Sequence, residues 1–213
     1  MLKKITLIRH GTTLYNLQDR VQGSIDIKLS KEGYKDIENI NLNNTNYDYL
    51  YHSSLSRSKD TLYGLIDKYN INPKGIIQND LIIERSYGIF EGLTKTEINN
   101  KYPEKYNEWI KNENIKGENI ESIENVIRRF KLFLHEIINS DKNNILAITH
   151  SGFLYAMYKF VSKKDLYIKP NDLDINFNNG CVVFLTLDID KDETKITFDY
   201  QNKKLTKIIK NFH

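Results

Sequence analysis

Two short apolar runs, each followed at once by a polar tip that contains a histidine, constrain the fold of this chain more than any other feature. The first run covers residues 5–8 and ends at Arg9-His10-Gly11, and the second covers residues 145–148 and ends at Thr149-His150-Ser151-Gly152. Apolar runs of this length are typical of buried strands. Ligands bind beyond the carboxyl ends of parallel strands, so we expect both histidines at one functional edge of a sheet.

Amphipathic stretches alternate with the strand candidates. Apolar residues recur with helical spacing over residues 56–69 and 123–138, and a second strand candidate covers residues 47–52. Strands that alternate with helices favour a largely parallel sheet with helices on both faces. The predicted fold class is therefore α/β, a three-layer α/β/α sandwich with a mostly parallel central sheet.

The length of 213 residues suits one domain, and we predict that residues 1–213 form it. Residues 88–117 are polar and rich in Lys, Asn and Glu, so we expect a helical lid insertion there, with Thr94 capping its first helix. Residues 76–83 are expected to form a third strand with its trailing edge. Residues 203–210 are expected to be a basic tail.

Charge and cysteine content exclude several classes of protein. The 31 basic residues are scattered among 28 acidic ones, which does not predict binding to nucleic acid. Cys181 is the one cysteine, so neither an intrachain disulfide nor a thiolate metal cluster can form, and a reducing compartment fits best. Because no apolar run reaches the length of a signal-peptide core or a membrane span, we expect a cytoplasmic protein without membrane association. A homodimer is compatible with the sequence, which does not determine the oligomeric state.

Arginines accompany the two strand-end histidines. Arg9 directly precedes His10, and Arg57 follows the second strand candidate, so two guanidinium groups are expected at the same edge. Taken alone, Arg57 would be a surface residue paired with Asp60, and each histidine would only terminate its strand. Together they favour a phosphate site, because guanidinium forks suit phosphate oxygens and displacement at phosphorus needs cations around those oxygens.

The motifs of other phosphate and metal chemistries do not occur in the sequence. There is no P-loop, no Gly-x-Gly-x-x-Gly fingerprint, and no histidine pair at the spacing of helical metal ligands. We therefore predict a site that uses neither a metal nor a cofactor.

Several blocks of sequence, in order along most of the chain, resemble the histidine phosphatase superfamily, whose members are phosphoglycerate-mutase-like. The blocks are Leu7-Ile8-Arg9-His10-Gly11-Thr12-Thr13-Leu14-Tyr15-Asn16, Gln22-Gly23 with Asp26 and Gly33, Ser53-Ser54-Leu55-Ser56-Arg57-Ser58 with Thr61, Glu84-Arg85-Ser86-Tyr87-Gly88 with Glu91-Gly92, Gly117-Glu118, and Thr149-His150-Ser151-Gly152. One block would be weak support, but their joint spacing is a strong signal.

The resemblance implies a role for each matching residue. His10 would attack phosphorus, while Arg9, Arg57 and His150 would hold the equatorial phosphate oxygens. Glu84 falls where the family keeps its proton donor, which protonates the leaving alkoxide and later deprotonates water; an ordinary loop carboxylate is the alternative. The other residues expected to bind substrate or phosphate are Thr13, Asn16, Gln22, Gly23, Tyr87, Lys95, Ser151 and Gly152.

Three functions remain: a phosphatase of small phosphorylated metabolites, a 2,3-bisphosphoglycerate-dependent phosphoglycerate mutase, and a non-catalytic phosphate-binding module. We favour the phosphatase, a phosphomonoester hydrolase, because mutases that resemble this chain carry a longer insertion with neighbouring arginines, whereas residues 88–117 contain none. Lys95 does match a lysine of the mutase pattern. The binding module is disfavoured, since His10, Glu84 and His150 are all present. The substrate is not identified by these motifs, and the departures from them at Thr12, Ser58 and Asn119 bear on substrate preference.

Overall fold

The computed structural model describes residues 1–43, 45–111, 117–168 and 172–210. Their strands form one sheet in the order β3-β2-β4-β1-β5-β6-β7. The strands are β1 (Leu2–Arg9), β2 (Tyr49–His52), β3 (Gly75–Gln78), β4 (Asn144–Thr149), β5 (Val182–Ile189), β6 (Glu193–Tyr200) and β7 (Lys203–Lys210). The helices are α1 (Leu14–Leu17), α2 (Lys31–Asn39), α3 (Ser56–Tyr69), α4 (Lys95–Lys101), α5 (Pro103–Lys111), α6 (Ile123–Ile138) and α7 (Ser151–Ser162), with the 3-10 turns η1 (Asp80–Ile82) and η2 (Gly88–Phe90).

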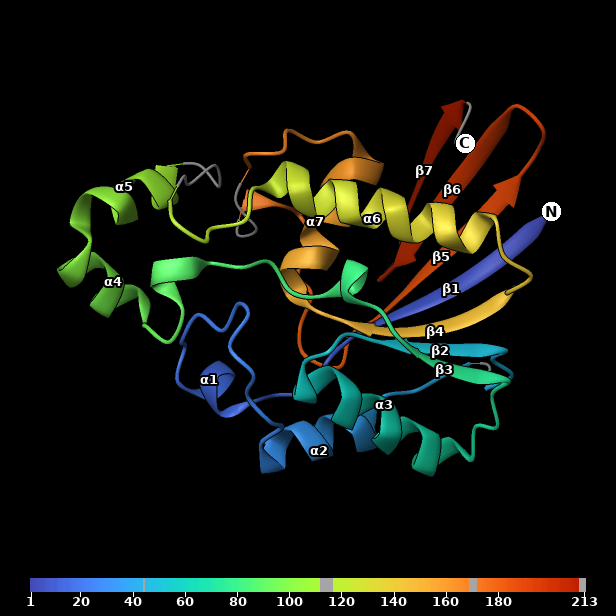
Figure 1. The fold of residues 1–213 in the computed structure, drawn as a ribbon, viewed down its shortest axis with the longest axis horizontal. Helices are drawn as coiled ribbons and strands as arrows, with labels where there is room; N and C mark the ends of the chain where they lie inside the picture. Colours follow the sequence, from blue (N-terminus) through green and yellow to red (C-terminus); the bar gives the residue numbers. More distant parts are fainter. Residues whose placement is uncertain (44, 112–116, 169–171, 211–213) are drawn as a thin grey trace.

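Helices cover the sheet on two sides (Figure 1). On one side α2 and α3 pack against β1, β2 and β4 through a cluster that includes Ile37, Leu62, Leu65, Leu50 and Ile148. On the other side α6 and α7 cover a larger apolar core that extends to β5 and β6. The three-layer α/β/α arrangement predicted from the alternating pattern is thus confirmed.

The parallel part of the sheet is smaller than the sequence predicts. Pairing is parallel from β3 through β2 and β4 to β1, and antiparallel from β1 through β5 and β6 to β7. β1 and β4 are parallel neighbours, with Arg9 opposite Thr149 in the register. His10 and His150, which follow these two strands, therefore emerge side by side at one edge, as expected.

The segment expected to be a basic tail is strand β7. It pairs with β6 along its whole length, from Tyr200 opposite Lys203 to Glu193 opposite Lys210. The two linking residues, Gln201-Asn202, have φ values of 46° and 65°, as in a tight two-residue hairpin turn. Gln-Asn is not one of the dipeptides that usually indicate such a turn. The many lysines of residues 203–210 also obscured the alternation of inward and outward residues that is typical of a strand.

The expected third strand is also shorter than predicted. β3 ends at Gln78, and Asn79 then caps a 3-10 turn by accepting a hydrogen bond from the Leu81 amide at 2.9 Å. Asparagine side chains compete with strand pairing in this way by bonding to nearby backbone. The chain consequently turns away from the sheet before Glu84.

Helices α4 and α5 project beyond the sheet and form what we call the α4–α5 arm, residues 95–111 (Figure 1). A small cluster around Phe90, Ile98 and Trp109 holds the arm together, and the Trp109 ring stacks on Phe90 at 5.3 Å. Thr94 caps α4 as predicted, in a capping box with Glu97. Residues 112–116 of the predicted lid insertion lie outside the described residues. Among the helices that the structure describes, none has the length and hydropathy of a membrane span.

Candidate active site

His10 directly follows β1, and its side chain is only 1% exposed. Its Nδ1 lies 2.7 Å from the carbonyl oxygen of Gly11. A carbonyl can only accept, so Nδ1 carries the proton and Nε2 keeps its lone pair. The next residue must be glycine, because a Cβ there would lie 2.6 Å from the carbonyl oxygen of Gly33. The imidazole is thus held with one nitrogen free to act as a nucleophile.

His150 follows β4 and places a second imidazole beside the first. The two ring centroids are 5.0 Å apart, with the planes tilted by 55°. His150 Nε2 lies 2.8 Å from Ser53 Oγ, and the amide of Leu55 donates to the same oxygen at 3.4 Å. The Ser53 hydroxyl is therefore placed to donate to Nε2, which leaves the proton of His150 on Nδ1.

Two arginines, the partly buried Arg9 and the fully buried Arg57, reach the same place from different elements. Arg9, the last residue of β1, donates from Nη1 to the carbonyl oxygen of Phe177 at 2.7 Å. Arg57, in the first turn of α3, donates to the carbonyl oxygens of Ile25 and Gly23, both at 2.8 Å. Backbone carbonyls, which carry only partial charge, therefore orient both guanidinium groups without neutralising them.

Three nitrogen atoms around His10 lack a hydrogen-bond partner. They are Arg9 Nε, Arg57 Nε and His150 Nδ1, and all three are buried without a partner in the described part of the chain. We call these three nitrogens the donor cradle. Buried polar groups are nearly always satisfied, so a group of unsatisfied donors indicates the position of a missing acceptor. Two of the three are cationic, which favours an anion.

Burial and neighbouring cations keep both imidazoles neutral. Desolvation, followed by repulsion from Arg57 and Arg9, holds the pKa of His10 well below its ordinary value of 6.5. Desolvation and repulsion from Arg57 likewise hold the pKa of His150 well below that value. Burial lowers the pKa of Arg57 to about 10, so this guanidinium is still charged at neutral pH. The site therefore combines a neutral nucleophile with cationic donors.

Glu84 lies at the same site, on the segment between η1 and η2. Its carboxylate accepts hydrogen bonds from the Arg85 amide at 2.8 Å and from Ser151 Oγ at 3.3 Å. Burial lowers the pKa of Arg9 and of Arg57, and the negative charge of Glu84 partly offsets this by raising both pKa values. A Cβ on Gly152 would lie 2.5 Å from Glu84 Oε1, so the glycine in the first turn of α7 leaves the room that this carboxylate occupies.

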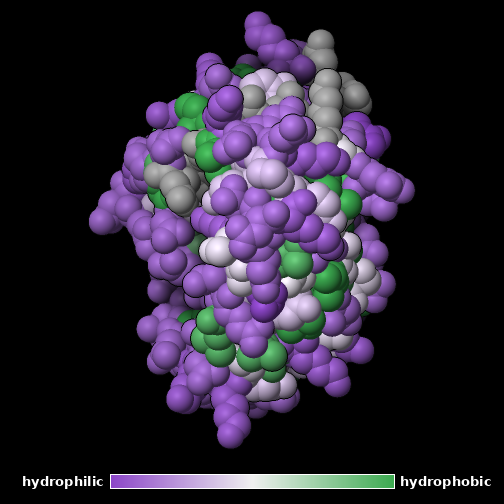
Figure 2. All heavy atoms as spheres, turned by 90° about the vertical axis from the view of Figure 1, so that its left-hand side faces the viewer, coloured by the Kyte–Doolittle hydropathy of each residue, from purple (hydrophilic) through white to green (hydrophobic). Residues whose placement is uncertain are grey.

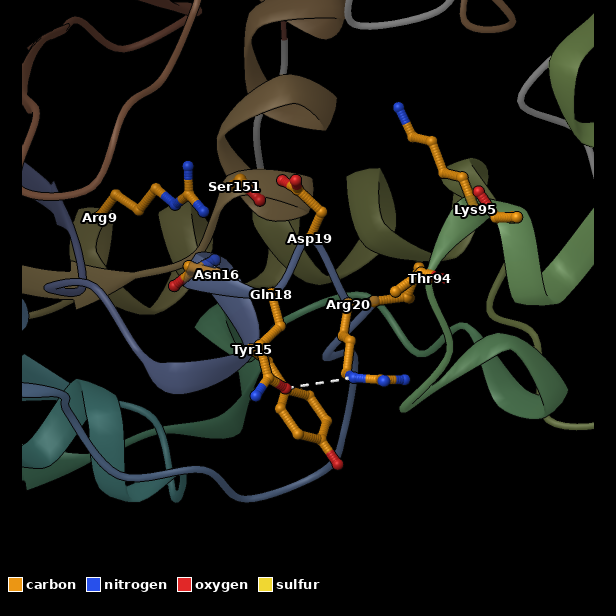
Figure 3. A pocket seen from close by; sticks show the side chains of 11 residues that line it. Arg9, Tyr15, Asn16, Gln18, Asp19, Arg20, Thr94, Lys95 and Ser151 are labelled. Carbon is orange, nitrogen blue, oxygen red and sulfur yellow. Dashed lines mark hydrogen bonds between the residues drawn. The ribbon is translucent and has the colours of Figure 1, made fainter.

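A cavity of about 820 Å³ opens beside these groups (Figure 3). Four of the predicted residues line it, namely Arg9, Asn16, Lys95 and Ser151. The amide of Thr13 donates to Asn16 Oδ1 at 3.0 Å, which leaves the Asn16 Nδ2 group to donate to a ligand. The end of the molecule that carries α1 and the α4–α5 arm is mostly hydrophilic, with small scattered hydrophobic patches (Figure 2).

Of the other residues predicted to bind substrate, three hold neighbouring parts of the site in place and one lies outside the cavity lining. Thr13 Oγ1 lies 2.8 Å from Gln22 Oε1, so these two side chains brace the loop after β1. Gly23 has a φ of 53° and supplies one of the carbonyls that hold Arg57. Tyr87 packs near Trp109, with ring centroids 6.0 Å apart, and is not among the residues that line the cavity. A direct role of Tyr87 in substrate binding stays a prediction.

Contacts of two further residues could not be assigned from the sequence. Ser53 stands in a block of the family resemblance, but its hydrogen bond to His150 joins residues far apart in the chain. Asn179 donates from Nδ2 to the carbonyl oxygen of His10 at 3.0 Å and to Asn16 Oδ1 at 3.2 Å. The sequence does contain a signal for Asn179, which lies in a polar turn just before β5. Because β5 is antiparallel to β1, its first residues lie at the same sheet edge as the residues that follow the parallel strands.

Within the described ranges, no three histidine, cysteine, aspartate or glutamate side chains come together as metal ligands. The expectation of metal-free chemistry stays a prediction.

Comparison with known proteins agrees with this geometry. The sequence model of the histidine phosphatase superfamily (branch 1) matches residues 5–198. Phosphoserine phosphatase 1 of Hydrogenobacter thermophilus is 30% identical over 159 residues, 73% of this chain and 74% of that protein. A 2,3-bisphosphoglycerate-dependent phosphoglycerate mutase of Buchnera aphidicola is 30% identical over 211 residues, 82% of this chain and 90% of that protein. Among solved structures, mycobacterial glucosyl-3-phosphoglycerate phosphatase with VO3 shares the fold with a TM-score of 0.75, at 20% identity over 94% of this chain and 99% of that one.

The chain belongs to the histidine phosphatase superfamily, and the resemblance drawn from its motifs is confirmed. The likeness to the mycobacterial structure, at 20% identity, supports the fold alone.

The neutral imidazoles predict how stability depends on pH. Their folded pKa values lie below the unfolded value of about 6.5, so the unfolded chain binds protons first as the pH falls. We expect the free energy of unfolding to decrease as the pH is lowered from about 6.5 toward the folded pKa values. Urea unfolding at pH 7.5 and 5.5 should show a smaller loss in His10→Gln than in the parent, and an unchanged loss in His135→Gln, an exposed histidine of α6. Equal losses in all three proteins would contradict the depressed pKa of His10.

Proposed function

We propose that this protein hydrolyses phosphomonoesters of small metabolites by way of a phosphate group bound covalently to His10. The observation that carries the proposal is the donor cradle, three buried nitrogens without an acceptor placed around a neutral imidazole. Membership of the superfamily and phosphatases among the similar proteins support the hydrolase class. We further propose that the protein acts in the cytoplasm as a single domain, with the α4–α5 arm as a lid over the cavity.

In the first step, His10 Nε2 attacks phosphorus and the bond from phosphorus to the ester oxygen breaks. The donor cradle binds the equatorial oxygens, where negative charge is concentrated in the transition state. Asn16 Nδ2 is placed to donate to the same phosphate from the wall of the cavity. Glu84 in its acid form gives a proton to the leaving oxygen, which departs as an alcohol.

In the second step, water attacks phosphorus and the bond from phosphorus to nitrogen breaks. Glu84, now a carboxylate, accepts a proton from the water, and inorganic phosphate is released. The hydrogen bond from Nδ1 to the carbonyl of Gly11 keeps the ring in one tautomer throughout the cycle. His10 is regenerated with its lone pair on Nε2.

A phosphoglycerate mutase is the second candidate, favoured by the mutases among the similar proteins and by Lys95 in the cavity wall. A mutase must exclude water and hold a doubly phosphorylated intermediate while it reorients, which requires additional cations around the site. Residues 88–117, which include the arm, contain lysines and no arginine. The cavity is also lined by the carboxylate of Asp19, which would repel a second phosphate. We therefore prefer the phosphatase.

The phosphohistidine is tested by His10→Ala. Turnover of an aryl phosphate should fall on the order of a thousandfold or more, because the covalent route is lost. An alkaline denaturing quench of the parent during turnover should yield a base-stable, acid-labile phosphoryl group that the variant lacks. His135→Ala, on an exposed face of α6, is the matched control. Parent turnover should persist with a chelator present. Near-parental turnover by His10→Ala would refute the assignment.

The proton donor is tested by Glu84→Gln, which keeps the shape of the side chain. Alkyl phosphates, whose leaving oxygen needs a proton, should lose on the order of a hundredfold in the rate of phosphoenzyme formation, and aryl phosphates much less. Rapid-quench measurement of that single step avoids interference from slow water attack. Glu108→Gln on the exposed face of α5 should leave both rates unchanged. Equal losses for both substrate types would exclude Glu84 as the donor.

The choice between phosphatase and mutase rests on product analysis. We expect release of inorganic phosphate from monoesters without a bisphosphate primer, and only slow interconversion of 2- and 3-phosphoglycerate. Phosphorus NMR follows both reactions in one sample. Primer-dependent interconversion far faster than phosphate release would establish the mutase instead.

A further inference from the structure

The carboxylate of Glu91 lies where two segments of the site meet. Its Oε1 accepts hydrogen bonds from the Ser24 amide at 2.9 Å and from the Tyr87 amide at 2.8 Å. The Ser24 hydroxyl donates to Oε2 at 2.7 Å. Three donors therefore hold one side chain that has no step in the proposed mechanism.

The peptide unit between Gly23 and Ser24 connects this carboxylate to Arg57. Its N–H is the Ser24 amide that donates to Glu91, and its carbonyl oxygen accepts from Arg57 Nη2 at 2.8 Å. A trans peptide unit is planar, with its N–H and C=O on opposite sides, so a partner that fixes the N–H also fixes the direction of the carbonyl. Glu91 thus sets the orientation of one of the two carbonyls that hold the guanidinium group.

The same contact explains the glycine at position 23. Gly23 has a φ of 53°, and a Cβ there would lie 2.0 Å from Glu91 Oε1 and 2.4 Å from Glu91 Cδ. Any other residue would therefore strain the backbone and displace the carboxylate at the same time. Because this position carries no side chain, the carboxylate reaches the peptide unit directly.

Glu91 acts on the guanidinium group at one remove. In the part of the chain that the structure describes, Glu91 and Arg57 form no ion pair, so the carboxylate does not neutralise the arginine by contact. The loop that carries the peptide unit has a second anchor, because Asp26 accepts from the amide and the hydroxyl of Ser56 at 2.7 and 2.6 Å. Removal of the Glu91 carboxylate should therefore free the peptide unit without releasing the loop.

We propose that Glu91 is a positioning residue that holds Arg57 in its phosphate-binding orientation through the peptide unit between Gly23 and Ser24. The inference rests on the proposed phosphatase function and adds a residue to it. Two carbonyls hold Nη1 and Nη2 of Arg57, which keeps its Nε in the donor cradle. When the Gly23 carbonyl is no longer held in direction, the guanidinium group can rotate, and the cradle loses one of its two cationic donors.

The affinity for inorganic phosphate tests this role. In Glu91→Ala the dissociation constant of phosphate, measured by titration calorimetry, should rise roughly five- to tenfold, because the peptide unit is no longer held. Glu91→Gln keeps the shape and one acceptor oxygen, so the rise should be only about two- to threefold. Glu108→Ala, on the exposed face of α5, is the matched control and should bind phosphate as the parent does.

A double-mutant cycle shows whether Glu91 acts through Arg57. Arg57→Lys keeps a positive charge but removes Nε and the planar fork that two carbonyls hold. In this background, the addition of Glu91→Ala should raise the dissociation constant by less than about twofold. A general loss of stability would weaken binding equally in both backgrounds. Urea unfolding of the same four proteins measures that loss separately.

The outcomes separate this inference from the proposed function. If the parent neither binds phosphate nor hydrolyses an aryl phosphate, the phosphatase fails and this inference fails with it. If the parent does both, but Glu91→Ala keeps the parental affinity or loses as much in the Arg57→Lys background, the positioning role is refuted while the phosphatase stands. Should Glu91→Ala not fold, Glu91→Gln takes its place in the cycle. Parental affinity in that variant, or a loss that persists undiminished in the Arg57→Lys background, would refute the role equally.

Discussion

The site depends on two arginines that backbone carbonyls hold in place and whose Nε atoms are buried. A carboxylate partner would orient Arg9 and Arg57 equally well, but it would also neutralise them before a substrate arrives. The carbonyls of Phe177, Ile25 and Gly23 fix the guanidinium groups and leave Nε of each without a partner. An unsatisfied buried donor costs about 1–3 kcal/mol, and more when it is charged. A phosphate that fills the donor cradle removes that penalty, so part of the stability given up in the free protein returns as affinity for the ligand.

The same arginines also contribute to the protonation state of His10, the proposed nucleophile. Burial, followed by repulsion from these cations, lowers the pKa of His10 and His150 together, so that the cations proposed to bind phosphate also help to keep the proposed nucleophile unprotonated. The same residues would therefore serve both the binding of phosphate and the activation of His10. A substitution that removed the charge of Arg57 would weaken the hold on phosphate and at the same time favour protonation of His10.

The sequence predicted those parts of the molecule that follow from local pattern. His10 and His150 were placed correctly because an apolar run of residues ends just before each of them, and parallel pairing of β1 with β4 brings such ends together. The hairpin to β7 was missed because positive φ at Gln201-Asn202 depends on the packing of the finished strand and not on a recognisable turn dipeptide. Ser53, Asn179 and Asp19 could not be assigned either, since their contacts or their place in the cavity join distant segments. Motif blocks indicate the groups that we propose to contact phosphate, whereas the residues around the remainder of a substrate are brought together by the tertiary fold.

A network of hydrogen bonds holds the segment that carries Glu84. Arg129 of α6 donates to the carbonyl oxygens of Leu81 and Ile83, at 2.8 and 3.1 Å, and so holds the chain that leads to Glu84. The same guanidinium pairs with Glu121, whose amide donates to the carbonyl oxygen of Ser86 at 2.9 Å on the far side of Glu84.

Ser86 Oγ donates in turn to the carbonyl oxygen of Asn119, in the segment that returns from the α4–α5 arm. Glu84 is therefore braced on both sides by one network, and that network includes Asn119, in the segment that follows the arm in the sequence. A displacement of this segment that broke the contact between Ser86 and Asn119 would loosen the position of the Glu84 carboxylate. In the proposed mechanism, the segment that follows the lid and the residue that protonates the leaving group share their supports, so closure over a substrate would be linked mechanically to proton transfer.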